Sequence, residues 1–402
     1  MATEITASAP LQGVRVLDLT NVLAGPFACH QLAHLGADVI KVEAVGRGDL
    51  ARNLGASQDL SAKGMGISFL AQNAGKRSLT LNLKHAAGKE ALRRLVATSD
   101  VLVENFRPGV MTRLGLGYDT LKTDNPTLIY CAISGFGQDG PWAASPAYDQ
   151  IIQGASGVMS ITGDGAQPTR VGYPISDTIG GLTAAMAISA ALNATPRGAF
   201  IDVSMLEATL ATMGWVVSNH LIGGVTPQAN GNENPTSAPS GTFQAQDAPL
   251  NIATNKDEQW QALATILNRA DLLTDLRFTT REDRKANRHA LRLELETVLT
   301  SKPAAHWVHA LNAQGIPAGP VLTVPEILAH PQITSRNLIA QFDRIPGLDH
   351  PIDLLTTGFQ IDNQRPCVAT PPPALGQHTK DILTDLGYGE QDIQRMAEEG
   401  TI

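Results

Sequence analysis

The sequence has little cysteine and no excess of positive charge. Its 402 residues include three cysteines, Cys29, Cys131 and Cys367, which are far apart and form neither a CxxC motif nor a Cys/His ligand pattern. Scattered thiols of odd number indicate a reducing compartment, so we expect a cytoplasmic protein. The formal net charge of -8 leaves no basic face for phosphates, so no nucleic-acid partner is expected.

Targeting and membrane-spanning segments are also lacking. Residues 1–10 do not show the basic segment and apolar run of a signal peptide. No stretch is expected to reach the length of a transmembrane helix, so we expect no membrane association. The composition, 43% hydrophobic and 17% charged, is typical of a globular protein. The length predicts one large domain and a smaller one.

Three catalytic motifs are incomplete or absent. Gly46-Arg47-Gly48 and Gly163-Asp164-Gly165 both lack the third glycine of a dinucleotide fingerprint. Gly75-Lys76 resembles the end of a P-loop, but Leu70 stands where the first glycine belongs and Arg77 replaces the hydroxyl residue. GxSxG does not occur. These gaps disfavour a dehydrogenase, an ATP-driven ligase and a serine hydrolase.

The histidines indicate no metal centre. HExxH is absent, and His30 and His34 would share one helix face without a carboxylate or thiolate companion. We interpret this pair as structural residues at the helix surface or core edge.

The first third of the chain alternates short β-branched runs with helical patterns, which predicts a parallel sheet in an α/β fold. Strands are expected at Val14–Leu19, Val39–Val42, Leu79–Leu83, Val101–Val103 and Leu128–Ile133. Helices are expected at Phe27–Leu35, Ala86–Thr98, Thr178–Leu192 and Leu206–Val217. Residues 223–247, rich in Gly, Asn, Pro and Ser, indicate a connector between domains.

Four blocks, taken in order along the chain, resemble the family III CoA-transferases. They are Leu11–Thr20 with Ala24-Gly25-Pro26 and Leu35–Glu43; Gly75–Ser78, Val103–Gly109 and Arg113–Gly115; Ser134–Pro141 with Tyr148-Asp149 and Asp177; and Gly315–Pro320 with Leu375–His378. No single block is decisive, but together they span nearly the whole chain.

The resemblance implies a fold and an activity. The expected fold is α/β, with a Rossmann-like large domain and a smaller α/β domain in an interlocked homodimer. Residues 1–216 would form the first part of the CoA-binding domain, 217–330 the linkers and small domain, and 331–402 the return to the large domain. The expected activity moves CoA from an acyl-CoA donor, with succinyl-CoA as one candidate, to a small carboxylic acid. The CoA thioester is a substrate, and no tightly bound cofactor is implied.

Asp177 matches the nucleophilic aspartate of that family. Attack on the donor thioester would give a mixed anhydride and then an aspartyl-CoA thioester. An aspartate is ordinarily ionised at neutral pH, so no base is expected to be needed. From spacing alone, an Asp before a small-residue helix is more often an N-cap. The resemblance favours the catalytic interpretation.

The resemblance also implies a set of CoA and substrate contacts. They are Asn105, Arg113 and Lys84 near the nucleotide and its phosphates, Tyr148 near the thioester, Asp149 as a further substrate or CoA contact, and Arg47 in place of an adenine-side arginine, where this chain has Ala44. Independently, Asn105 and Arg107 follow a strand at the carboxyl edge of the sheet, where α/β proteins bind ligands. Arg113 is equally interpretable as an ordinary surface charge.

Two alternatives to a transferase, and two questions about the site, remain open at the level of sequence. Racemases of the same superfamily carry a histidine before the aspartate, where this chain has Tyr148, so a 2-methylacyl-CoA racemase is the first alternative. A non-catalytic CoA-binding protein is the second. Asn230–Pro235 and Ser240-Gly241 are candidates for an active-site lid or for a plain connector. Arg170 and Tyr173 are candidates for holding the second carboxylate of a dicarboxylic acid.

Overall fold

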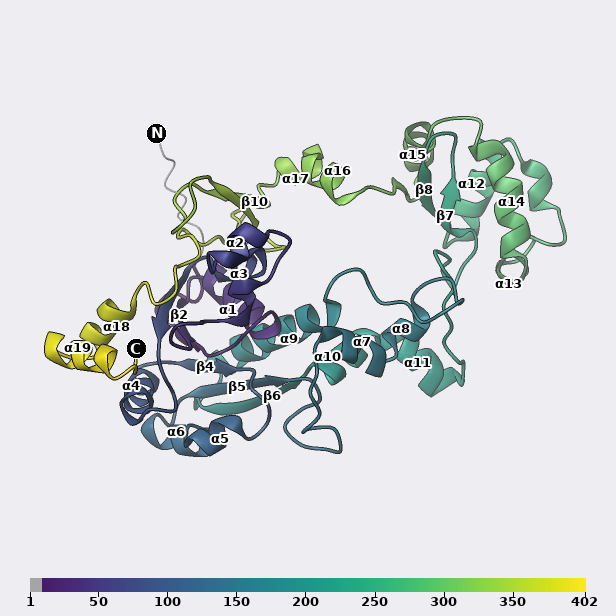
Figure 1. The fold of residues 1–402 in the computed structure, drawn as a ribbon. Coiled ribbons are helices and arrows are strands. Elements are labelled where there is room, and N and C mark those ends of the chain that lie inside the picture. Colours follow the sequence, from purple (N-terminus) through teal and green to yellow (C-terminus); the bar gives the residue numbers. More distant parts are fainter. Residues whose placement is uncertain (1–8) are drawn as a thin grey trace. The chain divides into compact units, whose positions relative to one another are not determined.

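A six-stranded sheet lies at the centre of the larger part of the molecule (Figure 1). The computed structural model describes residues 9–402. All six strands are parallel and lie in the order β3-β2-β1-β4-β5-β6. They are β1 (Arg15–Asp18), β2 (Asp38–Glu43), β3 (Lys76–Thr80), β4 (Val101–Glu104), β5 (Ile129–Ser134) and β6 (Ala199–Ser204). This is the order of doubly wound folds, so the expected parallel sheet is confirmed, and ligands are expected where β1 and β4 diverge.

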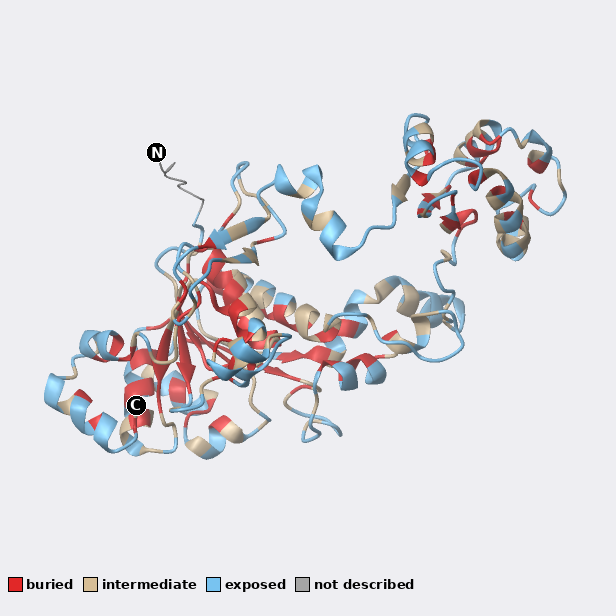
Figure 2. Ribbon diagram, turned by 45° about the horizontal axis from the view of Figure 1, so that its top comes forward, coloured by how far each residue is buried: buried red, intermediate tan, exposed pale blue. Residues whose placement is uncertain are grey.

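Helices cover both faces of the sheet, and the buried residues lie between the layers (Figure 2). One face is covered by α1 (Ala24–His34), α3 (Ile67–Asn73), α7 (Asp149–Ala155), α9 (Ile175–Leu192) and α10 (Met205–Thr212). The other is covered by α4 (Ala86–Val96), α5 (Val110–Leu114), α6 (Tyr118–Asp124), α18 (Thr379–Asp385) and α19 (Glu390–Glu398). The two faces therefore form separate apolar clusters.

Strand β3 begins three residues before the segment that the sequence indicated, at Lys76 instead of Leu79. Two charged residues enter the sheet because both find partners there. The Lys76 Nζ lies 2.8 Å from the buried Asp18 Oδ2, and Arg77 pairs with Asp38. Where the sequence predicted one helix at 206–217, the structure has two, α10 and α11 (Gly214–Gly223).

Helix α9 corrects the expectation about membrane-length segments. It has 18 residues and a mean hydropathy of 1.4, so by length and composition it is able to cross a membrane. The sequence pattern placed its start at Thr178 and made it too short. Ala184, Ile188 and Leu192 are buried in the cluster against the sheet, which accounts for much of its apolar character.

Residues near 378–401 return to β3. The Ser78 N–H donates to His378 Nδ1 at 3.1 Å, and the Thr80 N–H donates to Thr379 Oγ1 at 3.1 Å. The Asn82 N–H bonds the Thr401 carbonyl at 2.8 Å. Helices α18 and α19 then fill the apolar cluster beneath β3 and α4. A short hairpin of β10 (Ile339–Phe342) and β11 (Ile352–Leu355) contributes to the other cluster.

The chain forms two compact units. The first consists of the residues up to Val158, Arg170–Gly223 and Thr334–Ile402. The second consists of Met159–Thr169 and Gly224–Ile333. The sheet of the second unit is antiparallel, with β7 (Ser240–Gln244), β8 (Pro249–Ala253) and β9 (Ala318–Pro320). Its main helices are α12 (Asp257–Ile266), α13 (Arg281–Ala286), α14 (Arg288–Leu299) and α15 (Ala304–Asn312). Residues 159–169, which the sequence placed in the large domain, join this unit because the Gly231 N–H bonds the Gly163 carbonyl at 2.7 Å. The structure thus divides the chain at 223/224 and 333/334, compared with the expected 216/217 and 330/331.

Candidate active site

A pocket of about 380 Å³ lies at the carboxyl ends of β1, β4 and β5. Its wall combines the loop after β1, the loop after β4, the start of the loop after β5, and side chains from α9 and α10. The lining residues include Asn21–Ala24, Asn105–Pro108, Ser134, Gly135, Ala143, Ser145–Tyr148, Asp177 and Met205. This is the edge at which parallel α/β sheets bind ligands.

Asp177 is the only carboxylic acid among the residues that line this pocket. It is the third residue of α9, whose N-cap position is Pro174. The N-cap interpretation of Asp177 is therefore wrong, because its side chain does not close the helix end. Within residues 9–402 its carboxylate has no hydrogen-bond donor and no ion-pair partner. The side chain is thus available to a ligand in the pocket.

The environment of Asp177 favours the protonated acid. Burial disfavours the charge, and the nearby Asp149 carboxylate repels it, so together they raise the pKa of Asp177 to about 7. This shift favours the protonated form near neutral pH more than the sequence analysis expected of an ordinary aspartate. Perturbed acids of this kind are concentrated at functional sites.

Asp149 has a positioning role in the structure. It is 6% exposed, and its Oδ1 accepts the Ser176 N–H at 2.8 Å and the Asp177 N–H at 3.4 Å. Its Oδ2 accepts from Gln153 Nε2 at 2.6 Å. Asp149 therefore anchors the first turn of α9 with the bonds an N-cap would make, although it lies in α7. It does not line the pocket.

Two glycines let α9 pack closely against its neighbours, Gly181 against the start of α1 and Gly180 against α10. A Cβ on Gly181 would lie 2.5 Å from the Ala24 carbonyl oxygen, and one on Gly180 would lie 2.9 Å from Met205 Cγ. Both distances are shorter than real contacts allow, so only glycine fits. The close approach brings Asp177, one turn earlier in α9, to the same pocket as Leu23 and Ala24.

Asn105 fixes the loop after β1. Its Oδ1 accepts the Asn21 N–H at 2.8 Å, and its Nδ2 donates to the Asn21 carbonyl at 2.8 Å. Both backbone groups of Asn21 are thus held by one amide side chain. Asn105 lines the pocket as the sequence analysis expected of a ligand contact, and it also organises the pocket wall.

The other predicted contacts are dispersed. Tyr148 lines the pocket and is 68% exposed. Arg113 and Lys84 are exposed and do not line it. Arg47 lies in a separate hollow of about 530 Å³, together with Arg52 and Lys63. Their roles in CoA binding therefore stay predictions.

Sequence reasoning did not identify Asn21–Leu23 or Met205 as pocket residues. The signal for the first was available, because loops that follow the central strands of a parallel sheet meet at its ligand-binding edge. Met205 gave no signal in the sequence, since a Met at the start of an apolar helix is ordinarily a core residue.

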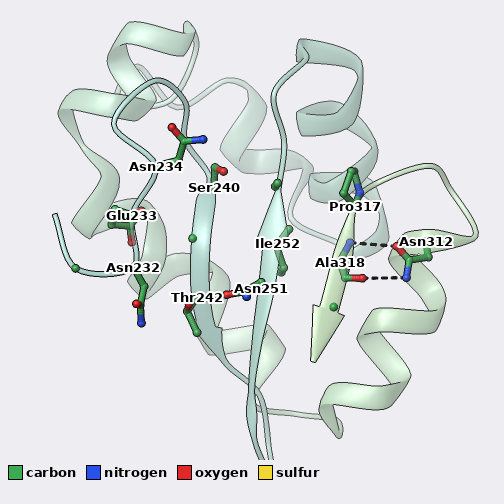
Figure 3. Close-up of a pocket in the computed structure, with 14 residues that line it drawn as sticks. Asn232, Glu233, Asn234, Ser240, Thr242, Asn251, Ile252, Asn312, Pro317 and Ala318 are labelled. Atoms are coloured by element: carbon green, nitrogen blue, oxygen red, sulfur yellow. Dashed lines mark hydrogen bonds between the residues drawn. The ribbon is translucent and has the colours of Figure 1, made fainter. Parts of the chain in front are cut away.

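The lid candidates of the sequence analysis line a different hollow, in the second unit. Figure 3 shows this pocket of about 680 Å³, with Asn232, Asn234 and Ser240 on one side and Asn312 on the other. The Asn312 side chain is engaged at both ends, bonding the Ala318 carbonyl and N–H (Figure 3). The single acid that lines this pocket, Glu233, is paired with Arg292. The lid function stays a prediction.

The histidine pair lies in the core. The rings of His30 and His34 are 4.3 Å apart, and both residues are buried. The His34 Nδ1 accepts the Val368 N–H at 3.2 Å. Burial lowers the pKa of His34 to about 4. Within residues 9–402 no group of three or more His, Cys, Asp or Glu side chains forms a metal site.

Comparisons with known proteins identify the family of the chain. The family model described as CoA-transferase family III matches residues 11–379. The chain is 42% identical over 363 residues to an acetyl-CoA:oxalate CoA-transferase of Acetobacter aceti. The alignment covers 89% of this chain and 92% of that protein. It is 37% identical over 400 residues to a succinate–glutarate CoA-transferase of Agrobacterium fabrum, with 96% and 97% covered. A crystal structure of a CaiB/BaiF family protein from Brucella suis superposes with a TM-score of 0.81 at 35% identity, over 94% of this chain and 100% of that one.

Proposed function

The chain belongs to CoA-transferase family III, and from this premise we propose that it transfers CoA to a carboxylic acid through covalent intermediates on Asp177. One observation carries the proposal. Among the described residues, Asp177 is the sole acid lining the pocket at the carboxyl edge of the sheet, and no cation forms an ion pair with it. A buried carboxylate without a cation retains its nucleophilicity, because no ion pair has to be broken before it attacks.

The proposed reaction proceeds by four acyl transfers. The Asp177 carboxylate attacks the thioester carbonyl of the donor, and the CoA thiolate leaves, giving a mixed anhydride. The thiolate then attacks the aspartyl carbonyl and releases the donor acid, which leaves an aspartyl-CoA thioester. The acceptor carboxylate attacks that thioester and expels the thiolate. Attack of the thiolate on the acceptor carbonyl releases the new acyl-CoA and restores the Asp177 carboxylate.

Each step generates negative charge beside the start of α1. Leu23 and Ala24, at the first turn of this 11-residue helix, line the pocket with Asp177. The positive end of a helix dipole stabilises an oxyanion at that position. The raised pKa of Asp177 also means that its carboxylate returns to charge in an apolar site, which makes it more reactive than a solvated aspartate.

The decisive experiment compares wild type with Asp177→Asn. Protein mixed with acyl-CoA alone should give an adduct that hydroxylamine converts to a hydroxamate on the peptide containing Asp177. The variant should bind CoA but lose transfer by about three orders of magnitude or more, since the covalent route is closed. An active variant, with deamidation back to Asp excluded by mass spectrometry, would refute the mechanism.

The racemase alternative has less support. Tyr148 stands before Asp149, and Asp149 accepts two hydrogen bonds from the first turn of α9 and a third from Gln153. Asp149 also does not line the pocket, which argues against its use as a base for an α-proton. Incubation with a chiral 2-methylacyl-CoA in deuterated water should therefore leave the α-hydrogen in place. Rapid deuteration without an acceptor acid would favour the racemase.

We propose succinyl-CoA as donor and a dicarboxylic acid as acceptor. The names of both curated relatives include dicarboxylic acids, oxalate in one and succinate and glutarate in the other. Arg107 is the cation among the pocket-lining residues, and it supplies a partner for a second carboxylate. A panel of mono- and dicarboxylic acceptors, followed by mass spectrometry, should show a preference for diacids that Arg107→Gln reduces.

We further propose a cytoplasmic homodimer. Trp215, Leu221 and Ile222 of α11 are 76–87% exposed, and Met186 of α9 is 68% exposed. Large apolar side chains this exposed are typical of surfaces that a second subunit covers. Light scattering at micromolar concentration should give the mass of a dimer. A well-folded monomer would refute this assembly.

A further inference from the structure

Val22, in the pocket wall, has an unusual backbone conformation. Its φ is 68°, in the left-handed region. Of the five described non-glycine residues with positive φ, the other four are Asn268, Asn337, Asp362 and Asn363, and Asn and Asp adopt this region at low cost. A β-branched residue does not, so Val22 stores strain that its surroundings must maintain.

The hold on Val22 comes from a buried carboxylate. The Val22 N–H donates to Asp49 Oδ1 at 3.0 Å. Asp49 is 1% exposed, and its Oδ2 lies 2.9 Å from the Lys41 Nζ, with both side chains fully buried. Asp49 Oδ1 also accepts the Ala51 N–H at 2.8 Å, which caps a short 3-10 turn.

Lys41 holds the same loop at a second point. Its Nζ donates to the Thr20 carbonyl at 2.9 Å. The loop after β1 is thus bonded through Thr20 by Lys41, through Asn21 by Asn105, and through Val22 by Asp49. Leu23 and Ala24, which follow directly, face the pocket that contains Asp177.

We propose that Asp49, supported by Lys41, is a positioning residue that keeps Val22 left-handed and so sets the loop opposite Asp177. Asp49 does not line the pocket and touches no reacting atom. It acts through the backbone of Val22. This proposal rests on the proposed function for its effect on turnover, but its structural content does not depend on the reaction.

The simpler explanation is that Asp49 only caps the turn at Leu50–Asn53 and neutralises a buried lysine. Loss of a cap or a buried ion pair lowers stability, but it leaves kcat of the folded enzyme unchanged. Loss of a positioning residue lowers kcat with little change in KM, because substrate still binds while the loop no longer faces the reacting carbonyl. The two explanations therefore differ in kcat and in the conformation of Val22.

The test uses Asp49→Ala in a double-mutant cycle with Val22→Gly, and crystal structures of the single variants. Glycine adopts positive φ without strain, so it removes the need for the hold. We expect Asp49→Ala to lower kcat for transfer from succinyl-CoA by about 10- to 100-fold, with KM within about threefold. In the Val22→Gly background the same substitution should lower kcat by less than about threefold, whatever Val22→Gly does alone. In the Asp49→Ala crystal, φ of Val22 should become negative.

Asp38→Ala is the matched control. Asp38 begins the same strand β2 and pairs with Arg15 and Arg77 at the opposite edge of the sheet. This variant should lose stability but keep kcat and the left-handed Val22. If Asp49→Ala does not fold, Asp49→Asn keeps the cap and an acceptor oxygen, and the same cycle with it should show the same direction with a smaller loss.

Retention of positive φ in Asp49→Ala, or equal losses of kcat in the two backgrounds, would overturn the proposal. A wild-type protein without transfer activity would instead refute the proposed function, and the conformation of Val22 in the Asp49→Ala crystal would still decide this inference.

Discussion

Two groups of buried charge in the same unit have opposite character. Beneath β1–β3, Asp18 lies 2.8 Å from the Lys76 Nζ, and Asp49 lies 2.9 Å from the Lys41 Nζ, all without solvent contact. At the start of α9, Asp149 and Asp177 lie together, and no cation accompanies them within residues 9–402. In the first group each carboxylate is paired with an ammonium group. In the second group Asp177 has no cationic partner.

The pKa values express this difference. Burial would raise the pKa of Asp18, but the ammonium groups of Lys41 and Lys76 hold it well below its usual range. Burial also acts on Asp177, and there the neighbouring Asp149 adds to it, so the pKa rises to about 7. Paired charges of the first kind maintain a backbone geometry. An unpaired acid in a pocket is available for chemistry, at a cost in stability.

We expect the largest effect from a substitution that breaks an ion pair of the first group. Lys41→Met should lower the free energy of unfolding by about 3–5 kcal/mol, because it leaves Asp49 charged and buried without its ammonium partner. Urea denaturation followed by fluorescence measures this change. Lys63→Met, which removes an exposed pair with Asp59, is the control and should have little effect. Equal losses in the two variants would show that the buried pair has no special weight.

The second prediction sharpens the contrast, because the unpaired acid should destabilise the protein. The folded-state pKa of Asp177 is raised from 3.8 to about 7. The unfolded chain therefore loses its proton first, and stability falls as pH rises from about 4 to about 7. Asp177→Asn removes this penalty and should be more stable than wild type at pH 8 by about 1–3 kcal/mol.

The advantage of Asp177→Asn should shrink towards pH 4, where the folded acid is protonated and the unfolded acid begins to take up its proton. Thermal unfolding at pH 4.5, 6 and 8 tests this pattern. A variant that is less stable than wild type at pH 8 would mean that the carboxylate has a stabilising partner.

The smallest expected effect concerns reactivity. Because the nucleophile is the ionised form, the rate of hydroxamate trapping should rise about tenfold between pH 6 and pH 8, as expected for a group with a pKa of about 7. Asp149→Asn keeps the acceptor oxygen for α9 but removes the repelling charge. It should move the profile to lower pH, and only modestly, since burial is the larger cause of the shift. An unchanged profile would exclude Asp149 as a contributor.

The sequence predicted the parallel sheet because alternating strands and helices are a local pattern. It misplaced β3 because the partner that admits Lys76 into the sheet, Asp18, is 58 residues away. The same limit applies to Asp177. Its place near the start of a helix was evident, but the cap was assigned wrongly, since the bonds that close this helix end come from Asp149, 27 residues earlier than Ser176.

The family resemblance was confirmed, and it identified Asp177, Tyr148 and Asn105 as residues that the structure brings to one pocket. It did not indicate Val22 or Asp49. A valine in an apolar stretch gives no local sign of a left-handed backbone, and Asp49 in a Gly-Asp pair resembles an ordinary turn residue. Their connection appears only when the loop after β1 and the turn after β2 are seen together.

The return of residues 378–401 to β3 has a consequence for protein synthesis. Thr379 follows Thr80, to which it bonds, by 299 residues. At a synthesis rate of about 5–20 residues per second, that interval lasts about 15–60 s. During this time Leu79, Leu92 and Leu95 lack the cover of Ile382 and Leu383, which complete their cluster. The nascent chain therefore leaves this apolar face uncovered until residues 379–383 are made, and its yield should depend on chaperones acting at the ribosome.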